Sequence, residues 1–133
     1  MIERRTTVVL AVEDEPRNAA LLQAILRAPA YELHLVTSIA AARRWLDVGE
    51  PGLVLLDRHL PDGDGLDLVE EIRSRATGSR CPVVLVSASA LASDRIAADV
   101  AGCDAFVAKP IRIRPFLEEL ERQIARSAGH LAH

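Results

Sequence analysis

Five short apolar segments, each followed by a stretch with helical spacing, restrict this chain to a narrow set of folds. The segments span residues 6–12, 32–37, 53–57, 82–86 and 105–107. Runs of this length and composition are typical of strands that are buried on both faces of a sheet. Their alternation with helices predicts a (βα)5 chain, a doubly wound α/β fold with a five-stranded parallel sheet and helices on both faces.

Helix start and stop signals separate the apolar segments. Pro16 suits the first position of a helix, and Pro29 stops that helix. Ser38 is a suitable N-cap, and Gly102 suits the position just after a helix. The remaining helices are predicted over residues 40–48, 66–75, 92–100 and 113–126. We expect a single domain over residues 1–133, with its core at about 6–127 and a frayed tail at 128–133.

Composition excludes several classes of protein. No apolar run approaches the roughly 18 residues that a membrane span needs. Residues 1–7 show no signal-peptide pattern, so we expect a cytoplasmic protein without a membrane partner. The net charge is −3 and no basic block is present, which argues against direct binding of nucleic acid. Cys81 and Cys103 lack zinc-site spacing and are interpreted as small buried side chains.

Polar and charged residues follow four of the five predicted strands. The first strand leads into Glu13 and Asp14, and three later strands lead into Asp57, Ser87 and Lys109. The carboxyl ends of parallel strands meet at one edge of the sheet, where ligands bind in folds of this class. Three carboxylates gathered there repel one another, and Mg²⁺ compensates such charge because it prefers oxygen ligands. The sequence therefore predicts a magnesium site beside a hydroxyl and an ammonium group.

This set of groups suits phosphoryl transfer. Asp57 is the best candidate nucleophile because it is the single acid after the central apolar strand, while the paired Glu13 and Asp14 suit metal ligation. Lys109 is the only lysine among 16 Lys and Arg residues, which indicates a need for a compact point charge. Taken singly, the acids could be solvated loop residues or turn caps, and Ser87 is uninformative. The conjunction at four strand ends carries the hypothesis.

Four segments at these strand ends resemble the receiver domain of two-component response regulators. They are residues 12–16 (VEDEP), 55–65 (LLDRHLPDGDG), 86–88 (VSA) and 106–110 (FVAKP). The resemblance runs from about Val8 to Ile124 and has all four segments in order. It implies a flavodoxin-like strand order of 2-1-3-4-5.

The resemblance implies a role for each residue of the cluster. Asp57 would accept a phosphoryl group and also ligate the metal. Asp14 would ligate Mg²⁺ directly and Glu13 through water, with Mn²⁺ as an alternative ion. The backbone carbonyl of His59 would complete the protein ligands, and Lys109 would pair with the phosphoryl group.

Switching and tuning residues are implied in the same way. Ser87 would swing toward the phosphoryl group and Phe106 would change rotamer in step, which reshapes the surface of the fourth helix, fifth strand and fifth helix. Without the resemblance, Phe106 is better interpreted as a core aromatic. Ala88 fits a preference for a small residue that leaves access to the phosphate. Arg58 and His59 would tune the phosphoryl lifetime.

The implied phosphodonor is a sensor histidine kinase or a histidine phosphotransfer protein. The output would be a downstream protein target or a homodimer through the fourth helix, fifth strand and fifth helix. The domain would catalyse its own Mg²⁺-dependent phosphorylation and dephosphorylation without being a turnover enzyme. Two positions depart from the common pattern: Glu13 stands where aspartate is frequent, and Gly52 where a polar residue often precedes the third strand.

Other functions remain open at this stage. A phosphatase with Asp57 as nucleophile would use His59 as its general acid, but the cap insertions that shape its substrate pocket are missing. A degenerate receiver that only binds partners would usually lack Asp57 or Lys109. A flavodoxin-like cofactor binder would want glycine and donor groups after the first strand, where acids stand. The sequence also leaves open whether the domain acts alone or belongs to a hybrid kinase or larger regulator.

Overall fold

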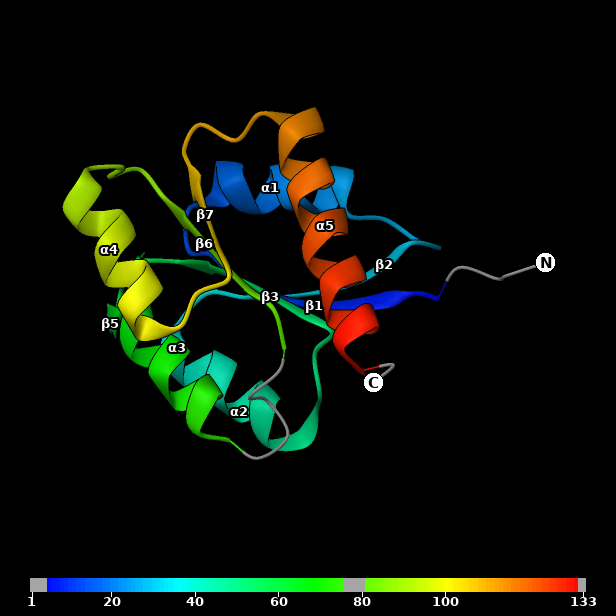
Figure 1. Ribbon diagram of the computed structural model, residues 1–133, viewed down its shortest axis with the longest axis horizontal. Helices are drawn as coiled ribbons and strands as arrows, with labels where there is room; N and C mark the ends of the chain where they lie inside the picture. The colour runs from blue at the N-terminus through cyan, green and yellow to red at the C-terminus, as the bar shows by residue number, and fades with distance from the viewer. Residues whose placement is uncertain (1–4, 76–80, 132–133) are drawn as a thin grey trace.

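Five strands form one parallel sheet in the computed structural model, which describes residues 5–75 and 81–131 (Figure 1). In chain order they are β1 (Thr7–Val12), β2 (Tyr31–Val36), β3 (Leu53–Asp57), β6 (Val83–Ser87) and β7 (Ala105–Ala108). Their spatial order is β2-β1-β3-β6-β7, and every neighbouring pair is parallel. Counted within this sheet alone, the order is 2-1-3-4-5, so the predicted fold is confirmed.

In the described part of the chain, four helices connect the strands of the sheet and a fifth follows the last strand. They are α1 (Pro16–Ile25), α2 (Ile39–Val48), α3 (Gly65–Ser74), α4 (Ala92–Ala101) and α5 (Ile113–Leu131). Helices α1 and α5 pack on one face, and α2, α3 and α4 pack on the other (Figure 1). In the described part of the chain, no helix combines the length and the apolar character that crossing a bilayer requires.

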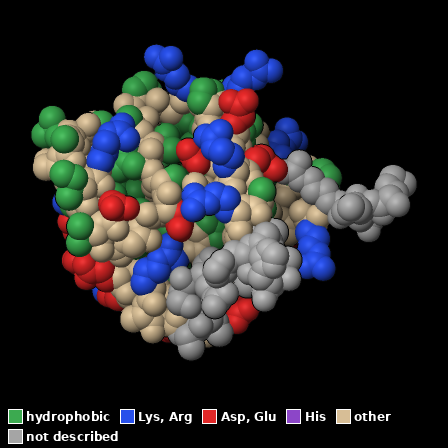
Figure 2. Space-filling view, in the orientation of Figure 1, with side chains coloured by type: hydrophobic (Ala, Val, Ile, Leu, Met, Phe, Trp, Pro, Cys, Tyr) green, Lys and Arg blue, Asp and Glu red, His purple; other side chains and the backbone are tan. Residues whose placement is uncertain are grey.

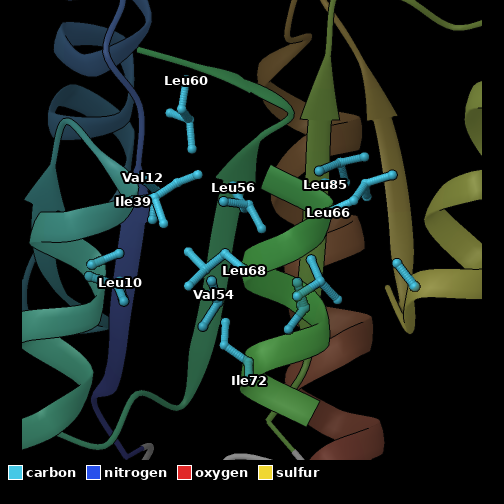
Figure 3. Close-up of a cluster of buried hydrophobic side chains, with 14 of the residues drawn as sticks. Leu10, Val12, Ile39, Val54, Leu56, Leu60, Leu66, Leu68, Ile72 and Leu85 are labelled. Carbon is cyan, nitrogen blue, oxygen red and sulfur yellow. The ribbon is translucent and has the colours of Figure 1, made fainter. Parts of the chain in front are cut away.

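Alternate residues of each central strand enter two separate cores. Along β3, Val54 and Leu56 pack with α2, α3 and α4, whereas Leu53 and Leu55 pack with α1 and α5. Side chains alternate in this way because successive residues of a strand point to opposite faces of the sheet. Figure 3 shows the first core, in which the α3 side chain of Ile72 points toward the sheet. Burial on both faces explains why β3 and β6 are apolar without interruption until their last residue.

Helix boundaries follow most of the predicted signals. Pro16 is the first residue of α1, and the Ser38 hydroxyl accepts a hydrogen bond from the N–H of Ala41 at the start of α2. Gly102 ends α4 with a φ of 106°, a conformation that glycine adopts readily. Helix α1 stops at Ile25, ahead of Pro29, because a proline lacks the N–H and clashes with the preceding turn.

The predicted end of α5 is wrong. The helix was expected over residues 113–126 with a frayed tail, but it continues to Leu131. Residues 127–131 contain no proline, and a single glycine lowers helix stability by only about 1 kcal/mol relative to alanine. Residues 132–133 of the expected tail lie outside the described residues.

A small hairpin between β3 and α3 is an element that the sequence pattern does not predict. It pairs β4 (His59–Leu60) with β5 (Gly63–Asp64) in antiparallel fashion. The Asp62 carboxylate at its turn accepts hydrogen bonds from the N–H groups of Ile39 and Ala40. These bonds satisfy free donors at the start of α2, so the hairpin is fixed against that helix. Its position matters because it directly follows Asp57.

Candidate functional site

The fold brings the predicted strand-end residues to one edge of the sheet. Glu13 follows β1, Asp57 is the last residue of β3, Ser87 is the last of β6, and Lys109 follows β7. The parallel register pairs Asp57 with Val86 on the neighbouring strand and aligns the remaining strand ends beside it. The predicted convergence of these residues is therefore confirmed in its geometry.

Asp57 is held by two hydrogen bonds. Its side chain is buried, with 8% of the residue exposed. One carboxylate oxygen, Oδ2, accepts from Lys109 Nζ at 2.9 Å, and Oδ1 accepts from the backbone N–H of His59 at 3.2 Å. Lys109 Nζ also lies 3.1 Å from Glu13 Oε1. A single ammonium group thus bridges two buried carboxylates.

Three acids offer ligands for a metal ion. Glu13, Asp14 and Asp57 each present one carboxylate oxygen, and these oxygens lie within 4.8 Å of one another. Glu13 and Asp57 are buried while Asp14 is exposed, so the trio opens to solvent on one side. An all-oxygen donor set with an open side fits a hard divalent cation that retains several waters. We call these three residues the acid trio.

Burial and neighbouring charges act in opposite directions on the pKa values of Glu13 and Lys109. Burial raises the pKa of Glu13 above its ordinary value, although the N–H of Glu15 and the ammonium of Lys109 act in the opposite direction. Burial alone would lower the pKa of Lys109, but the hydrogen bond and charge of Asp57, with Glu13, raise it above the ordinary value. Lys109 therefore stays an ammonium ion throughout the neutral range.

Ser87 lies at the site but its hydroxyl is bonded elsewhere. The side chain is fully buried, and Ser87 Oγ accepts from the backbone N–H of Ser89 at 3.2 Å. The Ser87 carbonyl oxygen accepts from the backbone N–H of Lys109 at 2.9 Å, which ties the end of β6 to the residue after β7. The serine is thus positioned beside the site while its hydroxyl is engaged with its own loop.

Gly65 permits the loop after Asp57 to close tightly. A Cβ atom at Gly65 would lie 2.3 Å from the carbonyl oxygen of Asp57, which is closer than real Cβ atoms approach. The N–H of Gly65 donates to the carbonyl oxygen of Arg58 at 2.6 Å. Asp64 then caps α3 by accepting from the N–H of Leu66. This close approach shows why a glycine is needed at the position.

Arg58 contacts residues that the sequence analysis did not connect with the site. Its guanidinium donates to Asp94 Oδ1 at 2.9 Å and lies 3.5 Å from Asp64 Oδ1. Asp94 is separated from Arg58 by 36 positions, and no spacing rule links the two. The only available signal was a bulky cation directly after the candidate nucleophile.

Phe106 lies on β7, and Ala88 lies directly after the last residue of β6. Phe106 of β7 is half-buried, and the guanidinium carbon of Arg95 lies 4.6 Å from its ring centroid. With Arg95 and Cys103, Phe106 lines a groove of about 170 Å³ between α4 and β7. Ala88 is exposed directly after Ser87. The ring therefore lies at the surface between helix and strand, where a change of rotamer would alter that surface.

The two cysteines are free thiols outside the metal cluster. Cys81 is buried and Cys103 is half-buried. Burial raises the pKa of Cys81 to about 12 and that of Cys103 to about 11, so both remain protonated at neutral pH. Among the described residues, neither belongs to a group that could hold a metal ion.

Comparisons with known proteins show which family this chain resembles. The response regulator receiver domain family matches residues 9–121. The transcriptional regulatory protein KdpE of Mycobacterium tuberculosis is 33% identical over 123 residues, which cover 92% of this chain and 53% of KdpE. The polar-differentiation response regulator DivK of Brucella ovis is 29% identical over 116 residues, which cover 87% of this chain and 94% of DivK. This chain thus spans about half the length of the first curated relatives and nearly all of DivK.

A solved structure extends the comparison to a metal-bound protein. The receiver domain of the sensor histidine kinase PA1611 from Pseudomonas aeruginosa PAO1 is 32% identical, with a TM-score of 0.82. The match covers 90% of this chain and 98% of that domain, which has a magnesium ion coordinated in its active-site cleft.

A parallel sheet that gathers an acid trio and a lysine at its carboxyl edge defines a class of phosphoacceptor domains. This chain belongs to the response regulator receiver domain family, and it is a phosphoacceptor signalling switch. Domains of this family act in signalling and are not turnover enzymes. The acid trio fits a divalent cation.

Proposed function

We propose that Asp57 accepts a phosphoryl group from a phosphohistidine of a sensor histidine kinase or a histidine phosphotransfer protein. The observation that carries this assignment is the bridge of Lys109 to Asp57 and Glu13 beside the acid trio. An oxygen of Asp57 attacks phosphorus, the bond from phosphorus to the imidazole nitrogen breaks, and that nitrogen keeps the electron pair while the ring takes up a proton from water. The product is an aspartyl phosphate on this domain and a neutral histidine on the donor.

Mg²⁺ is the cation we propose for the site, with Mn²⁺ able to replace it because both accept oxygen ligands. Asp14 and Asp57 would bind the ion directly, Glu13 would act through water, and the backbone carbonyl of His59 would complete the set. When bound, the ion neutralises charge that develops on the transferred phosphoryl oxygens. Lys109, which directly follows β7 and contacts Asp57 Oδ2, supplies a second positive charge.

Switching would begin at Ser87. Its Oγ, which accepts from the Ser89 N–H, would move so that its O–H donates to a phosphoryl oxygen, and Phe106 would turn inward from beneath Arg95. Since Phe106 lies between α4 and β7, this movement would change the face formed by α4, β7 and α5. Figure 2 shows hydrophobic side chains gathered over α4 on this face. We propose that it contacts a downstream protein or a second copy of the domain.

Tuning of the phosphoryl lifetime is assigned to Arg58, His59 and Ala88, which border Asp57 and Ser87 in sequence. The same site would catalyse phosphorylation from small phosphodonors and dephosphorylation by water, each dependent on the metal. The cytoplasmic location expected from the sequence stays a prediction.

Mass spectrometry of intact protein tests the acceptor assignment directly. After incubation with acetyl phosphate and MgCl₂, we expect one added phosphoryl group on the native protein and none on Asp57→Asn. Asp99→Asn, which removes an exposed acid from α4, is the matched control and should be labelled like the wild type. Labelling that persists in Asp57→Asn, or never occurs in the wild type, would refute the assignment.

A further inference from the structure

An ion pair connects the residue after Asp57 to the start of α4. Arg58 and Asp94 are mostly buried, with 20% and 16% of their side chains exposed. Their contact of 2.9 Å joins the loop after β3 to the first turn of α4. The second ion-pair partner of Arg58 among the described residues is Asp64, and neither acid belongs to the acid trio.

Asp94 extends this contact back to the loop after β6. Its Oδ2 atom accepts from Ser89 Oγ at 2.6 Å and from the backbone N–H of Leu91 at 3.0 Å. The hydroxyl of Ser89 lowers the pKa of Asp94 below its ordinary value, so the acid is ionised in neutral solution. The backbone N–H of Ser89 in turn donates to Ser87 Oγ. A continuous chain of contacts therefore runs from Arg58 through Asp94 and Ser89 to Ser87.

We propose that Arg58 is a positioning residue that acts through Asp94 to hold residues 87–91 where the Ser87 hydroxyl bonds to Ser89. The inference rests on the proposed function of Asp57. The swing proposed for Ser87 carries Oγ away from the Ser89 N–H, so it requires a shift of the loop that Asp94 fixes. The ion pair stabilises the conformation without the phosphoryl group, so it opposes phosphorylation.

Arginine suits this position better than lysine would. The planar guanidinium has donors at several angles, and here Nη1 contacts Asp94 while Nε faces Asp64. A lysine has one ammonium group and cannot contact both acids in that geometry. Arg58→Lys should therefore restore part of the restraint that Arg58→Met removes.

Hydrogen exchange of the unphosphorylated protein tests the restraint without any phosphoryl chemistry. In Arg58→Met and in Asp94→Asn, we expect the amides of residues 88–95 to exchange at least about fivefold faster, in line with a coupling of roughly 1 kcal/mol. Arg43→Met is the matched control because Arg43 pairs with Glu71 at 2.5 Å between α2 and α3. It should leave these amides unchanged. Unchanged exchange in Arg58→Met would overturn the proposal.

The initial rate of Asp57 labelling by acetyl phosphate supplies the functional readout. We expect Arg58→Met and Asp94→Asn each to raise this rate by about fivefold, the double variant to match either single variant, and Arg58→Lys to fall between. A slower rate would mean that Arg58 assists phosphorylation directly, and additive effects would mean that the two residues act separately; either result refutes the proposal. If the wild type is not labelled, the function of Asp57 fails, and the exchange measurement still decides whether Arg58 restrains the loop.

Discussion

Lys109 explains how two carboxylates remain buried at the edge of the sheet. A buried acid without a partner costs several kcal/mol, whereas the ammonium group lies 2.9 Å from Asp57 and 3.1 Å from Glu13. One positive charge faces three carboxylates, so the trio keeps an excess of negative charge. That excess favours binding of a divalent cation. Repulsion among the carboxylates also lowers the folding stability of the metal-free protein, so residues needed for function are unfavourable for stability.

Asp14 is the member of the trio at which this conflict is measurable. It is exposed, so replacing it leaves no buried group without a partner. Asp14→Asn removes one of three neighbouring negative charges, and we expect it to stabilise the metal-free protein by about 1 kcal/mol. The same variant should lose most of the stabilisation that MgCl₂ gives the wild type, because a direct ligand is missing.

Urea unfolding followed by circular dichroism, with and without MgCl₂, measures both effects. Asp99→Asn removes an exposed acid far along the chain from the trio and should change neither quantity. If Asp14→Asn is less stable than the wild type without metal, Asp14 is not repelled by its neighbouring acids. If MgCl₂ stabilises the variant as much as the wild type, Asp14 is not a metal ligand.

At the scale of elements, the loop from β3 to α3 decides where Asp57 and His59 lie. Gly65 allows the start of α3 to touch the end of β3. In Gly65→Ala the new methyl group would lie 2.3 Å from the Asp57 carbonyl oxygen, and backbone atoms cannot move aside as a flexible side chain does. We expect a loss of about 2–3 kcal/mol in unfolding free energy and slower labelling of Asp57.

Gly52→Ala is the matched control for this substitution. Its new Cβ would lie 3.2 Å from the Thr7 side chain, which can shift, and no backbone atom is closer than 3.5 Å. Urea midpoints and labelling rates of the two variants separate a local clash from a general effect of losing glycine. Equal stability of Gly65→Ala and wild type would contradict the close packing of this loop.

Sequence patterns predict the sheet well because its strands are buried on both faces. Asp57 and Ser87 each end an uninterrupted apolar strand, and the parallel topology alone then brings them together. The β4–β5 hairpin and the Arg58–Asp94 pair could not be predicted in the same way. They depend on contacts between segments whose separation only the packed structure fixes, and hairpins of two-residue strands carry too few residues to show a period. The end of α5 was missed because a glycine weakens a helix without stopping it.

At the scale of the whole molecule, the phosphoacceptor site and the proposed output face of α4, β7 and α5 occupy different parts of the surface. The site lies at the carboxyl ends of the strands. Three exposed hydrophobic side chains lie on α4 or at its N-cap: Leu91, Ile96 and Val100. Figure 2 shows hydrophobic side chains gathered over α4, with basic and acidic side chains over α5. Phe106 lies on β7 and lines a groove beside each of the two helices, so a change of its rotamer would alter this face.

Ile96 and Val100 test whether this face joins two copies of the domain. They are 63% and 81% exposed and lie four residues apart, so they share one stripe of α4. A two-fold symmetric dimer buries one copy of each side chain from each protomer, and each buried copy contributes about 1.5–3 kcal/mol. We expect the protein labelled with acetyl phosphate to double its mass in light scattering. Ile96→Lys with Val100→Lys should keep it monomeric while Asp57 is labelled at the normal rate.

Val48→Lys replaces a side chain that is 89% exposed at the end of α2, and it should dimerise like the wild type. A labelled wild type that stays monomeric would refute a homodimer through the α4 stripe. A double variant that still dimerises would place the interface elsewhere. Because the lysines lie outside the acid trio, loss of dimerisation with labelling intact would separate the output of the switch from its chemistry.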